Sequence, residues 1–418
     1  MSMKSFAPFI LLAILCMFVP LNGVSAQNDM SENGLRFNSS GDFKIMVVSD
    51  VQDSADVLRY TIDLMTKAIE HEQPDLVVLN GDNIWGIAPS LIVSKKNVKK
   101  SIDQFLAPIV DNGIPFAVVF GNHDAEPTMS KKEQIEYYQS FPNCVATINT
   151  IGDREGNYNL LVYDNSGIPA LNLWFLDSGR KATTEHGRGY AYVLDEQIAW
   201  YEQRAEELKE LNNGNPIPAM LFQHIPVPEI YELLSIVDKD TANAVQGYGR
   251  HSRNYYVLNK DMVVDGEMNE APCPPDFNNG QFGSWVSQGD IIAAVFGHDH
   301  INDFRGKYNG IELLYTSGVG FYSYGNGYKH GVRVIEFNED SVHDYTTRMV
   351  YWEDIEELSS VQIPEKLLYD GGFMRGDIYV YIGIAAFILL ALITALFLLI
   401  RLRIGRIKAK GSLAIEET

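Results

Sequence analysis

Carboxylate, carboxamide and imidazole side chains recur in five short motifs along this chain of 418 residues. The motifs are Ser49-Asp50-Val51-Gln52, Gly81-Asp82-Asn83, Gly121-Asn122-His123-Asp124, Gln223-His224 and Gly297-His298-Asp299-His300. Oxygen and nitrogen donors of these kinds, brought together, suit two metal ions that keep open positions for water and substrate. The motifs therefore predict a metal centre that could activate water for a hydrolytic reaction.

Each motif follows a run of apolar residues that is typical of a strand buried on both faces. These runs are residues 45–48, 76–79, 116–120, 219–222 and 291–296. Stretches with helical apolar spacing, residues 56–70 and 194–211, alternate with the runs, which predicts an α/β domain. Because sites in open α/β sheets gather at the carboxyl ends of strands, we expect the motifs to converge there. Residues 235–287 show neither pattern and are expected to form an irregular insertion.

The order of the motifs resembles the calcineurin-like metallophosphoesterases, whose pattern is D-x-H, G-D-x-x, G-N-H-[D/E], a lone H and G-H-x-H. The resemblance covers roughly residues 43–337. Further stretches are similar to the short purple-acid-phosphatase-like branch of plants and fungi: Leu176-Asp177-Ser178-Gly179, Gln197-Ile198-Ala199-Trp200-Tyr201 and residues 297–303. The resemblance implies a four-layer α/β/β/α sandwich. It also implies two divalent or trivalent ions, with Fe, Zn or Mn as the expected metals.

The resemblance implies a role for each polar residue of the motifs. Asp82 should bridge the two ions, with Asp50 and His300 on the first ion and Asn122, His224 and His298 on the second. His123 follows a ligand and should face the substrate, where it could protonate the leaving oxygen or stabilise phosphoryl charge. Asp124 is expected to orient His123.

Two positions depart from the family pattern. Gln52 stands where the family has histidine, so either its carbonyl oxygen coordinates weakly or the neighbouring Asp53 substitutes for it. Trp85 stands three residues after Asp82, where purple acid phosphatases have a tyrosine ligand, and an indole cannot coordinate. The identity of the first metal is therefore open. Loop residues that could rim the site are Arg188, Tyr190, Tyr322 and Tyr324.

The two ends of the chain predict a single-pass type I membrane protein. Residues 1–26 have the basic, apolar and small-residue regions of a secretory signal peptide. Residues 378–400 carry no charge and are long enough to span a bilayer, and the basic residues of 401–418 predict a cytoplasmic tail. Between these segments we expect a catalytic domain over residues 27–358 and a juxtamembrane stalk over residues 359–377. The domain would then face the extracellular space or the lumen of a secretory or endolysosomal compartment.

The charge of the chain argues against one class of binding partner, nucleic acid, and its cysteines and sequon suggest possible modifications. The chain has 33 basic and 54 acidic residues and a net charge of −21, which argues against nucleic acid as a partner. Cys144 and Cys273 would remain after signal removal and could form one disulfide or stay free. Asn38 begins a glycosylation sequon.

The expected activity is hydrolysis of a phosphate monoester, on a small molecule or a phosphoprotein, by a hydroxide that bridges the two metals. Two alternatives stay open. One is phosphodiesterase or nucleotide pyrophosphatase chemistry. The other is a catalytically weak, membrane-tethered binding protein, which Gln52 favours.

Overall fold

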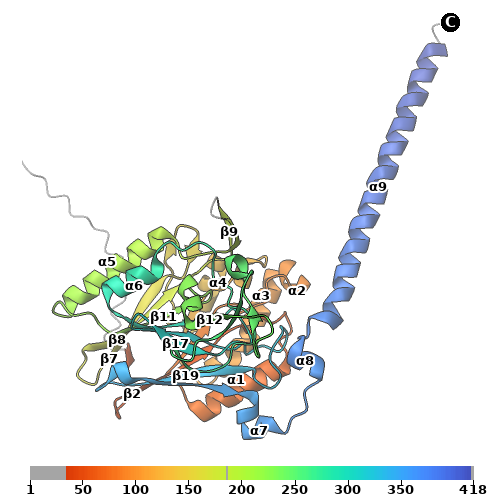
Figure 1. The fold of residues 1–418 in the computed structure, drawn as a ribbon. Coiled ribbons are helices and arrows are strands. Elements are labelled where there is room, and N and C mark those ends of the chain that lie inside the picture. The colour runs from red at the N-terminus through yellow and green to blue at the C-terminus, as the bar shows by residue number, and fades with distance from the viewer. Residues whose placement is uncertain (1–33, 185–186, 416–418) are drawn as a thin grey trace, which may run out of the picture. The chain divides into compact units, whose positions relative to one another are not determined.

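The computed structural model describes residues 34–184 and 187–415, so the predicted signal peptide lies outside the described residues. Two sheets form the centre of the domain (Figure 1). The larger sheet has the strand order β1 (Leu35–Arg36), β7 (Tyr158–Tyr163), β8 (Pro169–Leu176), β11 (Ala219–Gln223), β16 (Ile291–Phe296), β18 (Ile311–Tyr315), β17 (Arg305–Tyr308) and β15 (Val263–Asp265). The smaller sheet has the order β20 (Thr346–Tyr351), β19 (Gly331–Asn338), β2 (Asp42–Val48), β3 (Leu76–Asn80) and β4 (Phe116–Val119).

The two sheets pack face to face between two pairs of helices, which gives the four layers that the family resemblance implied. Along β8 and β11, Phe175 and Phe222 belong to the core shared with the smaller sheet, together with residues of α1 (Arg59–Glu72) and α3 (Lys95–Val110). The alternate residues Trp174 and Leu221 belong to a second core under α5 (Asp195–Leu211) and α6 (Gln281–Gln288). This alternation follows from the two-residue period of a strand, which turns successive side chains to opposite faces.

Parallel pairing explains how the five motifs meet. β2, β3 and β4 run parallel to one another in the smaller sheet. β8, β11, β16 and β18 run parallel in the larger sheet. Because the carboxyl ends of parallel strands lie at the same edge, each sheet brings its own motifs to one edge. The five predicted apolar runs lie in strands, except that Phe120 is one residue beyond the end of β4, and the two predicted helices correspond to α1 and α5.

Residues 235–287 are more regular than the sequence indicated. They contribute to a three-stranded antiparallel sheet of β12 (Leu234–Val237), β14 (Tyr255–Leu258) and β13 (Val245–Gln246), and they contain β15 and all but the last residue of α6. The expectation of an irregular insertion was therefore wrong, because strands of two to four residues are too short to show a two-residue period.

Cys144 and Cys273 are both free.

The remaining elements are short. They are α2 (Pro89–Ile92), η1 (His123–Ala125), α4 (Lys131–Tyr138), β5 (Thr150–Ile151), β6 (Arg154–Glu155), β9 (Lys181–Thr184), β10 (Gly187–Tyr190), η2 (Pro228–Leu233), η3 (Gly249–His251), η4 (Val342–Asp344) and η5 (Trp352–Asp354).

The chain after residue 355 forms α7 (Glu356–Ser359), α8 (Glu365–Tyr369) and α9 (Phe373–Ile415). Leu368 is buried in the core beside the smaller sheet. The Gly372 amide donates to the Tyr322 carbonyl (3.0 Å), and the Gly325 amide donates to the Tyr369 carbonyl (3.2 Å). Residues up to Gly372 therefore pack onto the domain, although the sequence indicated a stalk from residue 359.

Helix α9 contains the segment Ile382–Arg403, with a mean hydropathy of 2.9 and none of it buried. Among the described residues it is the one helical segment long and apolar enough to cross a membrane.

Candidate metal centre and active site

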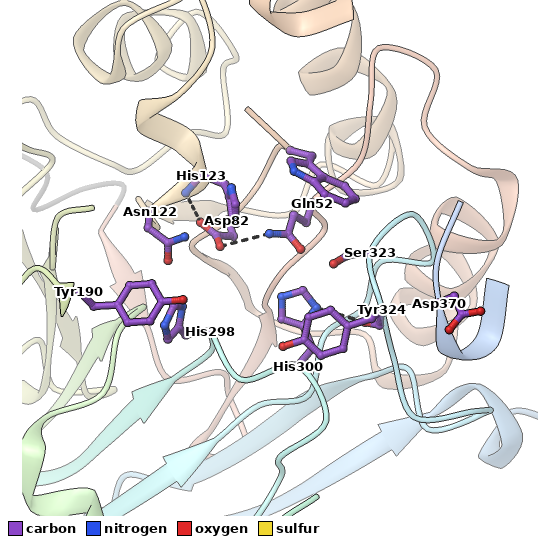
Figure 2. A pocket seen from close by; sticks show the side chains of 11 residues that line it. Gln52, Asp82, Asn122, His123, Tyr190, His298, His300, Ser323, Tyr324 and Asp370 are labelled. Carbon is purple, nitrogen blue, oxygen red and sulfur yellow. Dashed lines mark hydrogen bonds between the residues drawn. The ribbon is translucent and has the colours of Figure 1, made fainter. Parts of the chain in front are cut away.

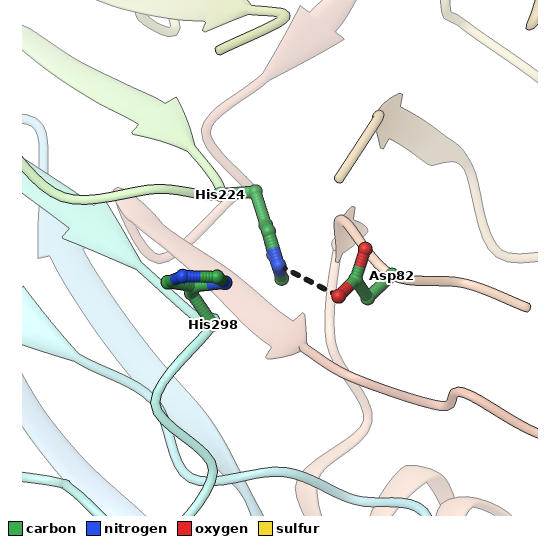
Figure 3. A group of neighbouring side chains, drawn as sticks. All are labelled: Asp82, His224 and His298. Carbon is green, nitrogen blue, oxygen red and sulfur yellow. Dashed lines mark ion pairs between the residues drawn. The ribbon is translucent and has the colours of Figure 1, made fainter. Parts of the chain in front are cut away.

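The predicted ligands lie in the loops that follow β2, β3, β4, β11 and β16, where the edges of the two sheets meet (Figure 2). Three of them, Asp82, His224 and His298, come from three different strands and have ligand atoms within 4.8 Å of one another (Figure 3). All three side chains are buried. The topology thus brings together donors that are more than 200 residues apart in the sequence.

The backbone at the predicted ligands has an unusual conformation. Asp50, Gln52, Asp82 and His298 all have positive φ angles, of 54°, 39°, 48° and 76°. Residues other than glycine rarely adopt this left-handed conformation, because the Cβ atom crowds the backbone. Such strain persists where the surrounding structure enforces it, commonly at functional sites. Four strained positions at one site indicate that the fold aims these side chains inward.

Glycines of the motifs allow the loops to approach the ligands closely. A Cβ atom on Gly121 would lie 2.2 Å from Oδ1 of Asp82. A Cβ atom on Gly297 would lie 1.8 Å from Oγ of Ser49, whose hydroxyl donates to Oδ2 of Asp50 at 2.6 Å. Both distances are far below van der Waals contact, so any larger residue would displace a predicted ligand.

The two aspartates lie between the other donors. Oδ2 of Asp82 is 3.1 Å from Nε2 of His224 and accepts a hydrogen bond from Nε2 of Gln52 at 3.4 Å. Oδ1 of Asp50 is 3.4 Å from Nε2 of His300 and 3.7 Å from Nε2 of His224. Asp50 and His300 thus lie together, and Asp82 lies with His224 and His298.

Several donor atoms of the site are buried without a hydrogen-bond partner in the described part of the chain. They are Asp50 Oδ1, Gln52 Oε1, Asn122 Oδ1, His224 Nε2 and His298 Nε2. A buried polar atom without a partner costs about 1–3 kcal/mol. Nε2 of His224 faces the Asp82 carboxylate, but the other four in one place would be expensive unless a ligand satisfied them. All five are atoms that coordinate metals. The residues therefore fit a metal centre.

Outer contacts fix which nitrogen of each imidazole faces the site. Nδ1 of His224 lies 3.0 Å from the Asn80 carbonyl oxygen, and Nδ1 of His300 lies 3.2 Å from the Tyr324 carbonyl oxygen. A carbonyl oxygen only accepts, so each Nδ1 carries the proton and each Nε2 is left to face the carboxylates. The ring of Tyr324 also stacks on His300, with centroids 4.3 Å apart.

The buried carboxylates Asp50 and Asp82 act on the neighbouring imidazoles. Burial lowers the pKa of His224, but the charges of Asp82 and Asp50 outweigh burial and raise it to about 10. Burial, with the nearby charge of His224, holds the pKa of His298 well below its usual value, so this imidazole is a neutral donor. A cation that bound here would replace the proton on His224 and compensate the carboxylates.

His123 contacts a different carboxylate from the one predicted. Its Nδ1 atom lies 2.6 Å from Oε2 of Glu126, whereas Asp124 accepts hydrogen bonds from the Gly121 amide (2.7 Å) and the Asn83 amide (3.0 Å). The prediction that Asp124 orients the His123 ring is corrected: Asp124 instead ties together the loops after β3 and β4. Glu126 was missed, although its position three residues after His123 in a helical turn is a usable clue.

The two departures from the family pattern also have defined positions. Gln52 lines the cavity of the site, whereas Asp53 turns away and accepts hydrogen bonds from the Ser54 amide (2.7 Å) and the Leu58 amide (2.9 Å). Asp53 is therefore not the substitute ligand that the sequence suggested. The indole of Trp85 lies edge-on to the His123 ring, with centroids 6.4 Å apart.

A cavity of about 230 Å³ opens over the predicted ligands. Of the expected rim residues, Tyr190 and Tyr324 line it, Tyr322 is buried beside Trp85, and the side chain of Arg188 lies outside the described residues. The described residues that line it are Gln52, Asp82, Trp85, Asn122, His123, Tyr190, His298, His300, Ser323, Tyr324 and Asp370. Ser323 and Asp370 were missed. Ser323 lies between Tyr322 and Tyr324, which were expected at the rim, whereas Asp370 reaches the site because the fold brings the segment before α9 back to it.

Comparison with known proteins identifies the family. The profile of the calcineurin-like phosphoesterases matches residues 43–302, which include every predicted ligand. The chain belongs to the calcineurin-like phosphoesterases. Membership assigns it, at a coarse level, to the enzymes that hydrolyse phosphoric esters with metal ions.

Relatives of this phosphoesterase confirm its resemblance to the purple-acid-phosphatase-like branch. It is 32% identical to "Probable inactive purple acid phosphatase 14" of Arabidopsis thaliana, over 74% of this chain and 78% of the relative. It is 25% identical to "Phosphatase DCR2" of Saccharomyces cerevisiae, over 76% and 55% of the two chains. Among solved structures, a dimetal phosphatase from Danio rerio is 14% identical with a TM-score of 0.46, over 73% of this chain and 98% of that one.

Proposed function

We propose that this phosphoesterase hydrolyses phosphate monoesters with two metal ions bound in the site. The observation that carries the proposal is a set of buried donor atoms that have no hydrogen-bond partner among the described residues: Asp50 Oδ1, Gln52 Oε1, Asn122 Oδ1 and His298 Nε2. Their arrangement around the two aspartates suits two ions rather than one, with Asp82 between them. Fe, Zn and Mn are the metals that best match this mixture of carboxylate, carboxamide and imidazole donors.

The residues divide between the two ions as follows. Asp50, His300 and, weakly, Gln52 would hold the first ion, and Asn122, His224 and His298 would hold the second. When bound, the metals would polarise the phosphoryl oxygens and lower the pKa of water so that a nucleophile exists at neutral pH. The carboxamide of Asn122 and the neutral ring of His298 contribute no charge, which leaves the ions electrophilic toward a phosphate.

His123 is the proton donor in this proposal. It lines the cavity, and its Nδ1 atom is held by Glu126, so Nε2 is the nitrogen free to reach a leaving group. Protonation of the leaving oxygen by a positioned imidazolium typically contributes about 10²–10⁴-fold to the rate. Its backbone amide donates to Oδ1 of Asp82 at 2.6 Å, which ties the acid to the residue that would be shared by the two ions.

The lining of the cavity supports a monoester of a small or uncharged alcohol. The described lining residues include neither arginine nor lysine. Asp370 would repel an anionic leaving group at the rim. Tyr190 and Trp85 supply aromatic walls that would suit an aryl or tyrosyl group. Phosphodiesters and nucleotide pyrophosphates fit this lining less well.

A second candidate is a binding protein with weak turnover. Gln52 is the observation that favours it, because a neutral carbonyl oxygen holds a transition metal less firmly than imidazole does. The purple-acid-phosphatase relative is also named as probably inactive. Turnover is favoured because all four histidines of the family motifs are present at the site: His123, His224, His298 and His300.

We further propose that α9 anchors the protein as a single-pass type I membrane protein with residues 401–418 in the cytoplasm. Cleavage after residue 26 and glycosylation at the exposed Asn38 would follow from that topology. Protease added to sealed vesicles should remove a tag from one end only. Digestion of the catalytic domain from the cytoplasmic side would contradict this topology.

The decisive test of function is turnover by the purified full-length protein, stripped of metal and reloaded with Fe, Zn or Mn. We expect an aryl phosphate monoester to be hydrolysed faster than the corresponding diester, with two equivalents of metal bound. His123→Ala should abolish most of the activity while metal content stays normal. Two bound equivalents without turnover of any phosphate ester would favour the binding protein instead.

A further inference from the structure

An apolar pair is exposed at the end of α2. Ile92 is 45% exposed and its neighbour Val93 is 68% exposed, whereas Pro89 and Leu91 of the same helix are buried. The buried residues anchor α2 in the domain, so the pair is held at the surface by a packed element. Two adjacent aliphatic side chains presented in this way are suited to enter an apolar environment.

Four lysines follow this pair at the start of α3. They are Lys95, Lys96, Lys99 and Lys100, all exposed, in a chain whose net charge is −21. Lys95 and Lys100 form ion pairs with Glu133 and Asp56. Lys96 forms no ion pair with a described residue. We call Ile92, Val93, Lys96 and Lys99 the α2–α3 patch. Aliphatic residues flanked by lysines are the pattern that rests on a lipid surface, with the aliphatic side chains at the acyl boundary and the lysines among the headgroup phosphates.

The position of the patch singles out the bilayer as its occupant. Residues of α2 are in contact with α9, the helix that contains the candidate membrane span. The helical segment from Phe373 to Ile382, where the apolar span begins, is only about 14 Å long at about 1.5 Å per residue. Surface elements at the start of α9 therefore stay close to any membrane that α9 enters.

We infer that the α2–α3 patch rests on the surface of the bilayer that α9 spans, with Ile92 and Val93 at the boundary of the acyl chains and Lys96 and Lys99 at the headgroups. The inference rests on the proposed anchor. It has a consequence for the active site, because Trp85, four residues before α2, lines the cavity. The Tyr322 carbonyl, beside the lining residue Ser323, is bound to the Gly372 amide. The cavity is thus held near the membrane by two segments.

The test uses the full-length protein in lipid nanodiscs, on a background without native cysteines. A nitroxide at Val93→Cys reports its collisions with lipid-soluble oxygen and with a water-soluble nickel chelate. The matched control is Ile236→Cys in β12, which is 66% exposed. Leu392→Cys, 63% exposed in α9, monitors the anchor itself. We expect oxygen collisions to dominate at positions 93 and 392 and nickel collisions to dominate at position 236.

Accessibility to nickel at position 93 equal to that at position 236, with position 392 still in lipid, would overturn the docking and leave the anchor intact. Nickel access at position 392 would overturn both. A label at position 93 shielded from both reagents would indicate a protein partner and would also overturn the inference.

Charge reversal tests the role of the lysines, and the nitroxide at position 93 is again the readout. A lysine near an anionic surface contributes about fivefold to partitioning. We expect phosphatidylserine to raise the ratio of oxygen to nickel collisions at position 93, and Lys96→Glu with Lys99→Glu to abolish that rise. Lys239→Glu with Lys307→Glu, at exposed positions elsewhere, should preserve it. If phosphatidylserine did not change the ratio of oxygen to nickel collisions in the labelled protein with its lysines intact, the role of the lysines would be overturned.

Discussion

The Nδ1 atom of His123 lies 2.6 Å from Oε2 of Glu126, and the other oxygen of Glu126 accepts a hydrogen bond from Arg180 at 2.8 Å. The carboxylate is therefore fixed on both sides. Burial lowers the pKa of His123, but the charge of Asp82 and the hydrogen bond to Glu126 outweigh burial, so the pKa is raised. Bound metal ions would offset the contribution of Asp82. Glu126 is then the group that keeps His123 protonated.

Glu126→Gln tests this pairing, because it keeps an acceptor but removes the charge. We expect kcat to fall about 10–100-fold with little change in KM and normal metal content. The alkaline limb of kcat against pH should move to lower pH, since His123 would lose its proton earlier. Glu136→Gln, at an exposed position of α4, is the matched control and should change neither quantity. Loss of metal together with activity would show that Glu126 is structural.

Gly297→Ala tests the close packing of the last motif against the first. Its Cβ atom would lie 1.8 Å from Oγ of Ser49 and 2.7 Å from Oδ2 of Asp50, so the loop must move. We expect metal affinity to fall at least about 10-fold, comparable to the loss of an outer-shell contact. Gly283→Ala is the control, because nothing lies within 4 Å of that position in α6. It should bind metal normally and gain about 0.5–1 kcal/mol of stability. Equal metal affinity in the two variants, measured by titration into stripped protein, would refute the packing argument.

Gln52 is the position where substitution should distinguish a weak ligand from a bystander. Its Oε1 atom is buried and has no hydrogen-bond partner in the part of the chain that the structure describes, and Asp53 points elsewhere. We expect Gln52→His to keep or tighten the first metal, and Gln52→Ala to weaken it less than Asp50→Ala does, because Asp50 contributes a full charge. Calorimetric titration of metal into the stripped variants measures this order. Greater damage from Gln52→Ala than from Asp50→Ala would reverse the ranking.

The sequence was sufficient to predict the strands and the ligands at their ends, because these depend on local patterns of residues. Apolar runs ending in Asp82 or His224 predict a buried strand and a ligand at its end, and parallel pairing then brings these ligands together. The sequence did not predict contacts between segments that are distant in the chain and meet only in the folded domain. Asp370 reaches the cavity only because Leu368 packs into the core, and nothing in residues 359–377 indicates that packing. The choice between Glu126 and Asp124 likewise depends on side-chain direction within one short turn.

The last prediction concerns stability and His330, which is buried and stacks on Phe321 with ring centroids 4.0 Å apart. Burial lowers the pKa of His330 from 6.5 to about 4, and its buried Nδ1 atom has no hydrogen-bond partner among the described residues. The unfolded chain therefore binds a proton between pH 6.5 and 4 that the folded protein does not. The contribution of His330 to the free energy of unfolding should be fully present above pH 6.5 and be lost as the pH falls toward 4, by up to about 3 kcal/mol.

We expect His330→Phe to flatten the dependence of the free energy of unfolding on pH, measured with urea between pH 4 and 7. His343→Phe, at an exposed position, should retain the slope of the unaltered protein. Release of metals in acid affects all three proteins, so the difference in slope isolates His330. An unchanged slope in His330→Phe would show that this histidine does not govern the acid sensitivity of the fold.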